Sequence, residues 1–114
     1  MKAVDMHAVP AVPWGDGCTA WPLVEGADLS VKLEVMPPGA AEVRHRHAAA
    51  RQFFYVLSGA LQMVLEAETI DVRAGQGLEV PPGRVHQARN PGAEAVQFLV
   101  VSSPTTRQDR QEMP

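Results

Sequence analysis

The sequence is poor in several residue types, and each shortage excludes a class of protein. A single cysteine, Cys18, excludes a disulfide within the chain and indicates a small half-buried side chain. The formal net charge of −3 argues against a nucleic-acid-binding protein, because phosphate binding needs a basic face. No apolar run approaches the ~18 residues of a membrane-spanning helix, and the N-terminus lacks a secretory signal. We expect a cytoplasmic protein with no nucleic-acid or membrane partner.

What the chain does contain fits one small folded domain. Of its 114 residues, 46% are hydrophobic and 20% are charged, which suits one core with one pocket. Pro10, Pro13 and Pro22 exclude a helix from the first 28 residues and favour an extended arm with edge strands. Trp14 and Trp21 are expected to anchor this arm to the body or to a partner subunit, with pocket lining as the alternative.

From residue 29 to residue 102 the chain is a series of short extended segments separated by turns. The first segment places Leu29, Val31, Leu33 and Val35 on one face and Ser30, Lys32 and Glu34 on the other. That alternation predicts a half-buried strand. Similar segments follow about every 8–12 residues with no convincing helix, which is typical of a β-sandwich or barrel. We predict an all-β barrel over residues 29–102, preceded by the arm (1–28) and followed by a frayed polar tail (103–114).

Three of the four histidines fall within the predicted barrel. His45 and His47 are two residues apart on an extended segment, so they share an inward face with Ala41 and Val43, with Cα atoms roughly 7 Å apart. Imidazole nitrogen suits Mn, Fe, Co, Ni, Cu and Zn alike. Burying several imidazoles without partners is unfavourable. With His86 supplied by a distant strand, the sequence predicts a site for one divalent transition-metal ion.

Three arginines, Arg44, Arg46 and Arg51, surround the histidine pair. We expect them to form a solvated strand face. The alternative is that Arg51 holds an anionic ligand, since a guanidinium group suits carboxylates and phosphates.

The first histidine segment has a regular internal spacing. Gly39 is followed after five residues by His45-x-His47, then after four residues by Gln52, and after six more by Gly59. It resembles the first motif of the cupin superfamily. The one difference is that the family has glutamate at the position where this chain has Gln52.

The second segment completes the resemblance. Gly75 is followed after five residues by Pro81-x-Gly83, then after two by His86 and after three by Asn90, which is the whole second cupin motif. Fifteen residues separate the two motifs, a short interval for the family. The resemblance implies a double-stranded β-helix, or jelly-roll barrel, with the metal at its mouth. Asn90 precedes a Pro-Gly pair and is expected to form a turn rather than bind metal.

The glutamine at position 52 is the one departure from the family motifs. The resemblance implies that Gln52 is the fourth metal ligand through its side-chain oxygen, or hydrogen-bonds a metal-bound water. Either way the site has one negative charge fewer, so a divalent ion would be a stronger Lewis acid. The substitution also removes a potential general base. Tyr55 and Glu79 are available as substitutes, although the sequence does not place them.

Two classes of function follow. The first is a metal-dependent enzyme acting on a small molecule, either an oxygenase such as a dioxygenase or an isomerase or lyase that uses Lewis-acid chemistry. The alternative is a non-catalytic ligand-binding or sensory module, while inward histidines disfavour a purely structural barrel. No catalytic residue is identified. Because an uncovered edge strand favours pairing, we expect a homodimer.

Overall fold

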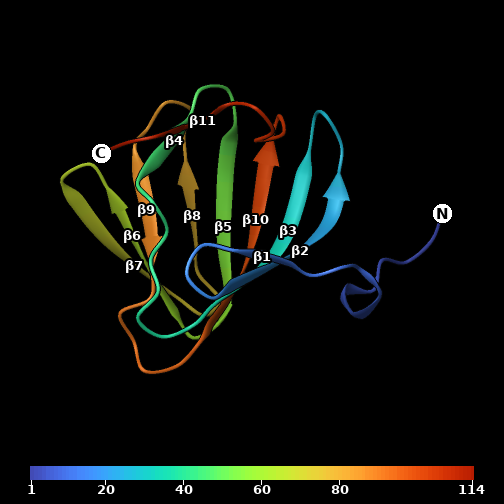
Figure 1. Ribbon diagram of the computed structural model, residues 1–114, viewed down its shortest axis with the longest axis horizontal. Coiled ribbons are helices and arrows are strands. Elements are labelled where there is room, and N and C mark those ends of the chain that lie inside the picture. The colour runs from blue at the N-terminus through green and yellow to red at the C-terminus, as the bar shows by residue number, and fades with distance from the viewer.

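The structure, a computed structural model, describes residues 1–114 and consists of two antiparallel β-sheets that enclose a common interior (Figure 1). The six-stranded sheet contains, in spatial order, β1 (Val12–Trp14), β2 (Cys18–Glu25), β3 (Ser30–Met36), β10 (Val96–Ser103), β5 (Arg51–Ser58) and β8 (Gly77–Val80). The five-stranded sheet contains β11 (Arg110–Glu112), β4 (His45–His47), β9 (His86–Arg89), β6 (Ala60–Leu65) and β7 (Glu68–Arg73). The one helix is a single 3-10 turn, η1 (Met6–Ala8), and no helix is long and apolar enough to cross a membrane. The predicted all-β double-stranded β-helix is confirmed.

The core lies between the sheets and follows the two-residue period of the strands. On β5 the side chains of Gln52, Phe54 and Val56 are buried and their neighbours are exposed. Phe98 of β10 and Met63 of β6 meet this face in one continuous apolar cluster. Since alternate residues of a strand point to opposite faces, the parity of β5 directs Gln52 inward, as the sequence indicates.

The turn between β5 and β6 accepts only glycine. Gly59 has a φ of +78°, and a Cβ atom there would lie 2.6 Å from the carbonyl oxygen of Ala95. Both the left-handed conformation and the close backbone approach exclude a side chain. This turn fixes the register of the β5–β6 hairpin and therefore the inward position of β5 side chains.

On β3 the alternation is confirmed but the polar face is the inward one. Ser30, Lys32 and Glu34 line the interior, whereas Leu29 is exposed on the outside. An amphipathic strand usually turns its apolar face to the core. Here the interior next to β3 is a cavity, and the outer face of the sheet is apolar.

Strand β4 is shorter than the sequence predicts. It begins at His45, and Val43 is 51% exposed rather than inward beside the histidines. The preceding residues form only an isolated bridge between Ala41 and Arg89. The inward side chains of this segment are therefore the two histidines and Glu42, which lines the interior although strand alternation would place it on the outer face with Arg44 and Arg46.

The C-terminal residues do not fray. After Ser103 the chain turns and returns as β11, which pairs with β4 in antiparallel register, Arg110 opposite His47 and Glu112 opposite His45. Figure 1 shows this red segment lying along the edge of the five-stranded sheet next to β4. Polar composition suggested a mobile tail, but backbone pairing to an open sheet edge gives these residues a fixed position.

Candidate metal centre

Two neighbouring strands bring the three barrel histidines together. His45 and His47 lie on β4, and His86 on β9 is the register partner of His45. Their side-chain nitrogens lie within 4.8 Å of one another, and the three residues are 2%, 6% and 1% exposed. The fourth histidine, His7, is exposed in the N-terminal arm. The cluster could hold a metal ion, because neutral imidazoles at this separation can share one centre.

Each histidine ring is oriented through its Nδ1 atom. His45 Nδ1 donates to the carbonyl oxygen of Val43 at 2.7 Å, and His86 Nδ1 donates to that of Arg84 at 2.9 Å. His47 Nδ1 donates to Asp109 Oδ1 at 2.8 Å. All three partners only accept hydrogen bonds, so each Nδ1 carries the proton and each Nε2 keeps a free lone pair. This arrangement is the one that metal-binding histidines adopt.

The contact with Asp109 is the part of the site that the sequence does not reveal. Its carboxylate also accepts from the backbone N–H groups of Ala49 and Ala50 at 3.2 and 2.9 Å. Burial acts to raise the pKa of Asp109, but the bonds from Ala50, His47 and Ala49 outweigh it and lower the pKa. The carboxylate is therefore ionised and fixes the His47 ring. No sequence signal marks Asp109, because it lies alone in a polar segment.

Burial keeps the histidines uncharged. Desolvation lowers the pKa of His45 from 6.5 to about 3 and also lowers the pKa values of His47 and His86. The bonds at Nδ1 act in the opposite direction, although they are too weak to restore the charged form. At neutral pH the cluster therefore offers uncharged imidazoles, which is the form that binds metals.

Gln52 points into the same space from the opposite sheet. It is 6% exposed, and its Nε2 donates to Ser102 Oγ at 3.2 Å. Its Oε1 is buried and has no hydrogen-bond partner, and the same is true of His86 Nε2. Buried polar atoms normally have partners. Two unpaired lone-pair atoms in one site fit the donor set that a divalent cation requires.

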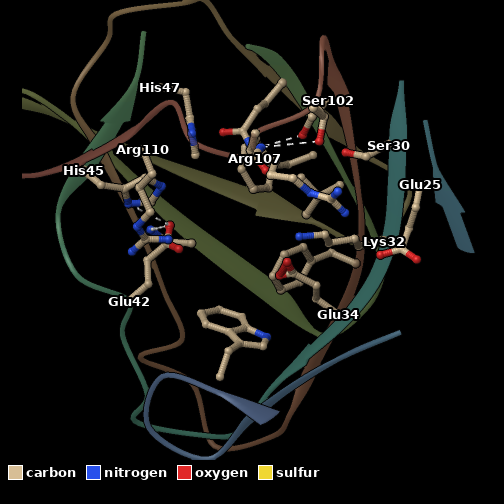
Figure 2. A pocket seen from close by; sticks show the side chains of 18 of the residues that line it. Glu25, Ser30, Lys32, Glu34, Glu42, His45, His47, Ser102, Arg107 and Arg110 are labelled. Atoms are coloured by element: carbon tan, nitrogen blue, oxygen red, sulfur yellow. Dashed lines mark hydrogen bonds and ion pairs between the residues drawn. The ribbon is translucent and has the colours of Figure 1, made fainter. Parts of the chain in front are cut away.

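A cavity of about 520 Å³ opens in front of these residues (Figure 2). His45, His47 and Gln52 form one part of its wall. Its charged lining residues are Glu25, Lys32, Glu34, Glu42, Arg107 and Arg110. Phe54, Phe98 and Val100 supply apolar surface. The cavity is large enough for a small-molecule ligand, and its lining is mainly polar.

Two carboxyl groups in this cavity have unusual acidities. Desolvation by burial raises the pKa of Glu34 from 4.5 to about 7, against the opposing effect of Lys32. Desolvation likewise raises the pKa of Glu42 to about 8, although the hydrogen bond from Ala88 N opposes it. Both groups therefore exchange protons near neutral pH.

Several residues singled out in the sequence lie elsewhere. Arg51 forms an ion pair with Glu79 on the outside of the barrel, so the solvated-face interpretation holds and Arg51 does not reach the cavity. Tyr55 also lies on that outer face. Asn90 forms a turn, as expected, by accepting from Gly92 N and donating to backbone carbonyls.

The arm contributes to the cavity as well. Trp14 of β1 packs against the core cluster, which anchors the arm to the body as expected, and it also lines the cavity, the alternative role considered for it. Its Nε1 is buried without a partner.

Relatives in sequence are consistent with this architecture. Residues 32–102 match the Cupin domain family. The chain is 38% identical over 72 residues to the polyketide synthase CurC of Streptomyces cyaneus, a match that covers 63% of this chain and 47% of CurC. It is 36% identical over 60 residues to SchB of Streptomyces halstedii, covering 53% of this chain and 44% of SchB. The chain thus spans about half the length of these two relatives.

Solved structures share the fold over nearly the whole chain. The polyketide cyclase RemF from Streptomyces resistomycificus superposes with a TM-score of 0.85 at 22% identity, covering 100% of this chain and 86% of RemF. A cupin-superfamily sugar phosphate isomerase from Silicibacter pomeroyi superposes with a TM-score of 0.80 at 26% identity, covering 91% of this chain and 76% of the isomerase. With the fold, the histidine cluster and the family match in agreement, this chain is a member of the cupin family.

Proposed function

We propose that this protein is a metal-dependent enzyme that acts on a small molecule by Lewis-acid chemistry, in the isomerase or lyase class. One observation carries the proposal. Three buried imidazoles have their Nδ1 atoms satisfied by acceptors and their Nε2 lone pairs left free, and two of them, His45 and His47, line a cavity. A purely structural histidine cluster would have no reason to leave His86 Nε2 unpaired.

Gln52 is proposed as the fourth ligand, through Oε1. The bond from its Nε2 to Ser102 Oγ holds the amide so that Oε1 remains free. A ligand set of three imidazoles and one carboxamide has no charge. A bound divalent ion of Fe, Mn, Ni, Cu, Co or Zn would keep its full charge and supply polarisation of a substrate oxygen atom.

The carboxylate missing at position 52 is proposed to be replaced by one from the cavity wall. Glu42 Oε1 accepts from Ala88 N at 2.9 Å and lies 4.0 Å from His45 Nδ1. With its pKa raised to about 8, Glu42 can donate a proton to a substrate at neutral pH and take it back afterwards. Glu34, with a pKa of about 7, is suited to take a proton from the substrate. Tyr55 and Glu79 are not needed for this role.

Two observations favour the isomerase or lyase class over an oxygenase. One is the pair of carboxyl groups in the cavity wall, Glu34 and Glu42, and the other is the activity of two proteins with the same fold. RemF is a polyketide cyclase, and the Silicibacter pomeroyi protein is a sugar phosphate isomerase. Because cupins host many chemistries, the fold alone does not set the reaction. The argument rests on an uncharged ligand set facing groups that exchange protons near pH 7.

The experiment is elemental analysis of protein purified without added metal or a nickel column. We expect about one equivalent of a transition metal in the wild type and in His7→Ala, and none in His86→Ala. His7 is a matched control because it is exposed and outside the cluster. A wild-type protein without metal that takes up none on titration would leave the alternative, a non-catalytic ligand-binding module.

We also propose a homodimer, formed through the outer face of the six-stranded sheet. Phe53, Tyr55 and Leu57 of β5 are 43%, 36% and 43% exposed on that face. Contiguous exposed apolar side chains usually mark an interface. The N-terminal arm is less suited to this role, because Trp14 packs against its own barrel.

A further inference from the structure

Four buried side-chain atoms have no hydrogen-bond partner, and they fall into two kinds. Gln52 Oε1 and His86 Nε2 present lone pairs, which suit a cation. Trp14 Nε1 can only donate, and Ser30 Oγ can donate or accept. Trp14 and Ser30 line the cavity but belong to β1 and β3 of the six-stranded sheet, whereas the histidines lie on the other sheet. The cavity therefore has a side that offers hydrogen-bond donors as well as a metal-binding side.

Two cationic side chains extend into the cavity from separate segments. Lys32 follows Ser30 on the inward face of β3, and Arg107 comes from the turn before β11. Figure 2 shows both side chains projecting toward the middle of the cavity, between Ser30 and Ser102 on one side and the histidines on the other. Neither cation forms an ion pair or a side-chain hydrogen bond within the chain. Other arginines, such as Arg51 and Arg84, are paired on the surface.

None of the cavity carboxyls forms an ion pair with Lys32 or Arg107. Burial raises the pKa of Glu34 to about 7, although the charge of Lys32 acts to lower it. Glu42 lies beside His45 and accepts a hydrogen bond from Ala88 N. Glu25 is exposed, and Arg110 adds a third cation with Glu112 at 3.7 Å. Lys32 and Arg107 are therefore cations of the cavity without a carboxylate partner, and they favour an anionic ligand.

We propose that the ligand of this cavity carries an anionic oxygen group, a carboxylate or a phosphate, bound by Lys32 and Arg107 with the hydroxyl of Ser30. The guanidinium and ammonium groups supply charge-assisted hydrogen bonds, and Ser30 satisfies its free hydroxyl with an anionic oxygen. The remainder of the ligand reaches the histidine cluster. This inference rests on the proposed function for the location of the reaction but not for the anion site itself.

The anion site can be tested without the metal. Isothermal titration calorimetry on the full chain, after chelator treatment and at low ionic strength, would measure binding of inorganic phosphate, succinate and succinamide. Succinamide is the uncharged counterpart of succinate. We expect at least one of the two anions to bind and succinamide not to bind, and the stronger anion identifies the group. Lys32→Gln and Arg107→Gln should each weaken anion binding at least tenfold. Arg73→Gln, at an exposed site on β7 outside the cavity, should leave it unchanged.

The outcomes separate this inference from the proposed function. No anion binding by the wild type at millimolar concentration, or equal weakening by Arg73→Gln, would overturn the anion site. Circular dichroism spectra that match the wild type show that a variant is folded. Anion binding by a wild-type chain that takes up no metal on titration would contradict the metalloenzyme proposal alone. Metal binding with no anion binding would contradict only this inference.

Discussion

The Nδ1 atom of His47 and the Oδ1 atom of Asp109 lie 2.8 Å apart, although 62 residues separate them in the sequence. The same carboxylate accepts from the N–H groups of Ala49 and Ala50 and so ties the end of the chain to the segment after β4. A carboxylate behind a ligating imidazole orients the ring and raises its basicity. The C-terminal residues are thereby part of the histidine site.

Replacing Asp109 should weaken metal binding without unfolding the barrel. We expect Asp109→Ala to lower metal affinity about 10–100-fold, the range typical of partners behind the ligands. Competition titration against a chromophoric chelator would measure the change. Gln111→Ala removes a nearby side chain of β11 that hydrogen-bonds Arg46 on the surface, and it should bind metal as the wild type does. Equal affinities for Asp109→Ala and wild type would contradict the orienting role.

Changing Gln52 should alter metal affinity in a direction set by charge. Gln52→Glu adds a negative oxygen ligand and is expected to tighten metal binding, whereas Gln52→Ala should weaken it about tenfold. Ser102→Ala removes the partner of Nε2 that orients the amide but keeps Oε1, so it should weaken metal binding less than Gln52→Ala does. If Gln52→Ala and wild type bind metal equally, Gln52 is not a ligand.

The metal-free protein should be most stable near pH 6.5. The three cluster histidines have lowered pKa values in the folded chain, so the unfolded chain takes up protons first as the pH falls below 6.5. Each histidine then reduces the free energy of unfolding by up to about 1.4 kcal/mol per pH unit. Glu34 and Glu42 partly offset this loss between pH 6.5 and 4.5, because their raised pKa values favour the folded chain at lower pH.

Above pH 6.5 the change in the free energy of unfolding comes from Glu34 and Glu42. Stability due to Glu34 and Glu42 is lost as the pH rises through about 7 and about 8. Glu42→Gln keeps an oxygen acceptor for Ala88 N and should remove the larger part of the alkaline decline. Urea denaturation of chelator-treated protein at pH 5, 6.5 and 8.5 would test both branches. A stability that rises steadily from pH 5 to pH 8.5 would refute the assignment of the buried carboxyls.

A charge on the outer sheet face should separate the proposed dimer. We expect Phe53→Glu to elute as a monomer in size-exclusion chromatography with light scattering, while the wild type elutes as a dimer. The reason is that a buried, unpaired carboxylate in an apolar interface is strongly unfavourable. Thr69→Glu, at an exposed position on β7 in the other sheet, should remain dimeric. A monomeric wild type would end the dimer proposal.

The sequence by itself determined the strands and the histidine cluster. Two-residue alternation and turn residues predict an all-β barrel, and local spacing directs His45 and His47 to one face. The two motifs bring in His86 and identify the family, which the match over residues 32–102 confirms. Gln52 could be directed inward because the parity of β5 is a local property of the strand.

The tertiary structure decided which polar residues surround that cluster. Lys32 and Glu34 belong to the polar face of an amphipathic strand, and only the cavity between the sheets makes this face the inward one. Asp109 and Arg107 reach the site because the end of the chain pairs with the free edge of β4. Sheet pairing joins residues that are distant in sequence, and neither hydrophobic periodicity nor composition encodes such contacts. The candidate metal ligands could thus be predicted from local patterns, whereas the groups proposed to orient them and to bind the ligand depend on long-range folding.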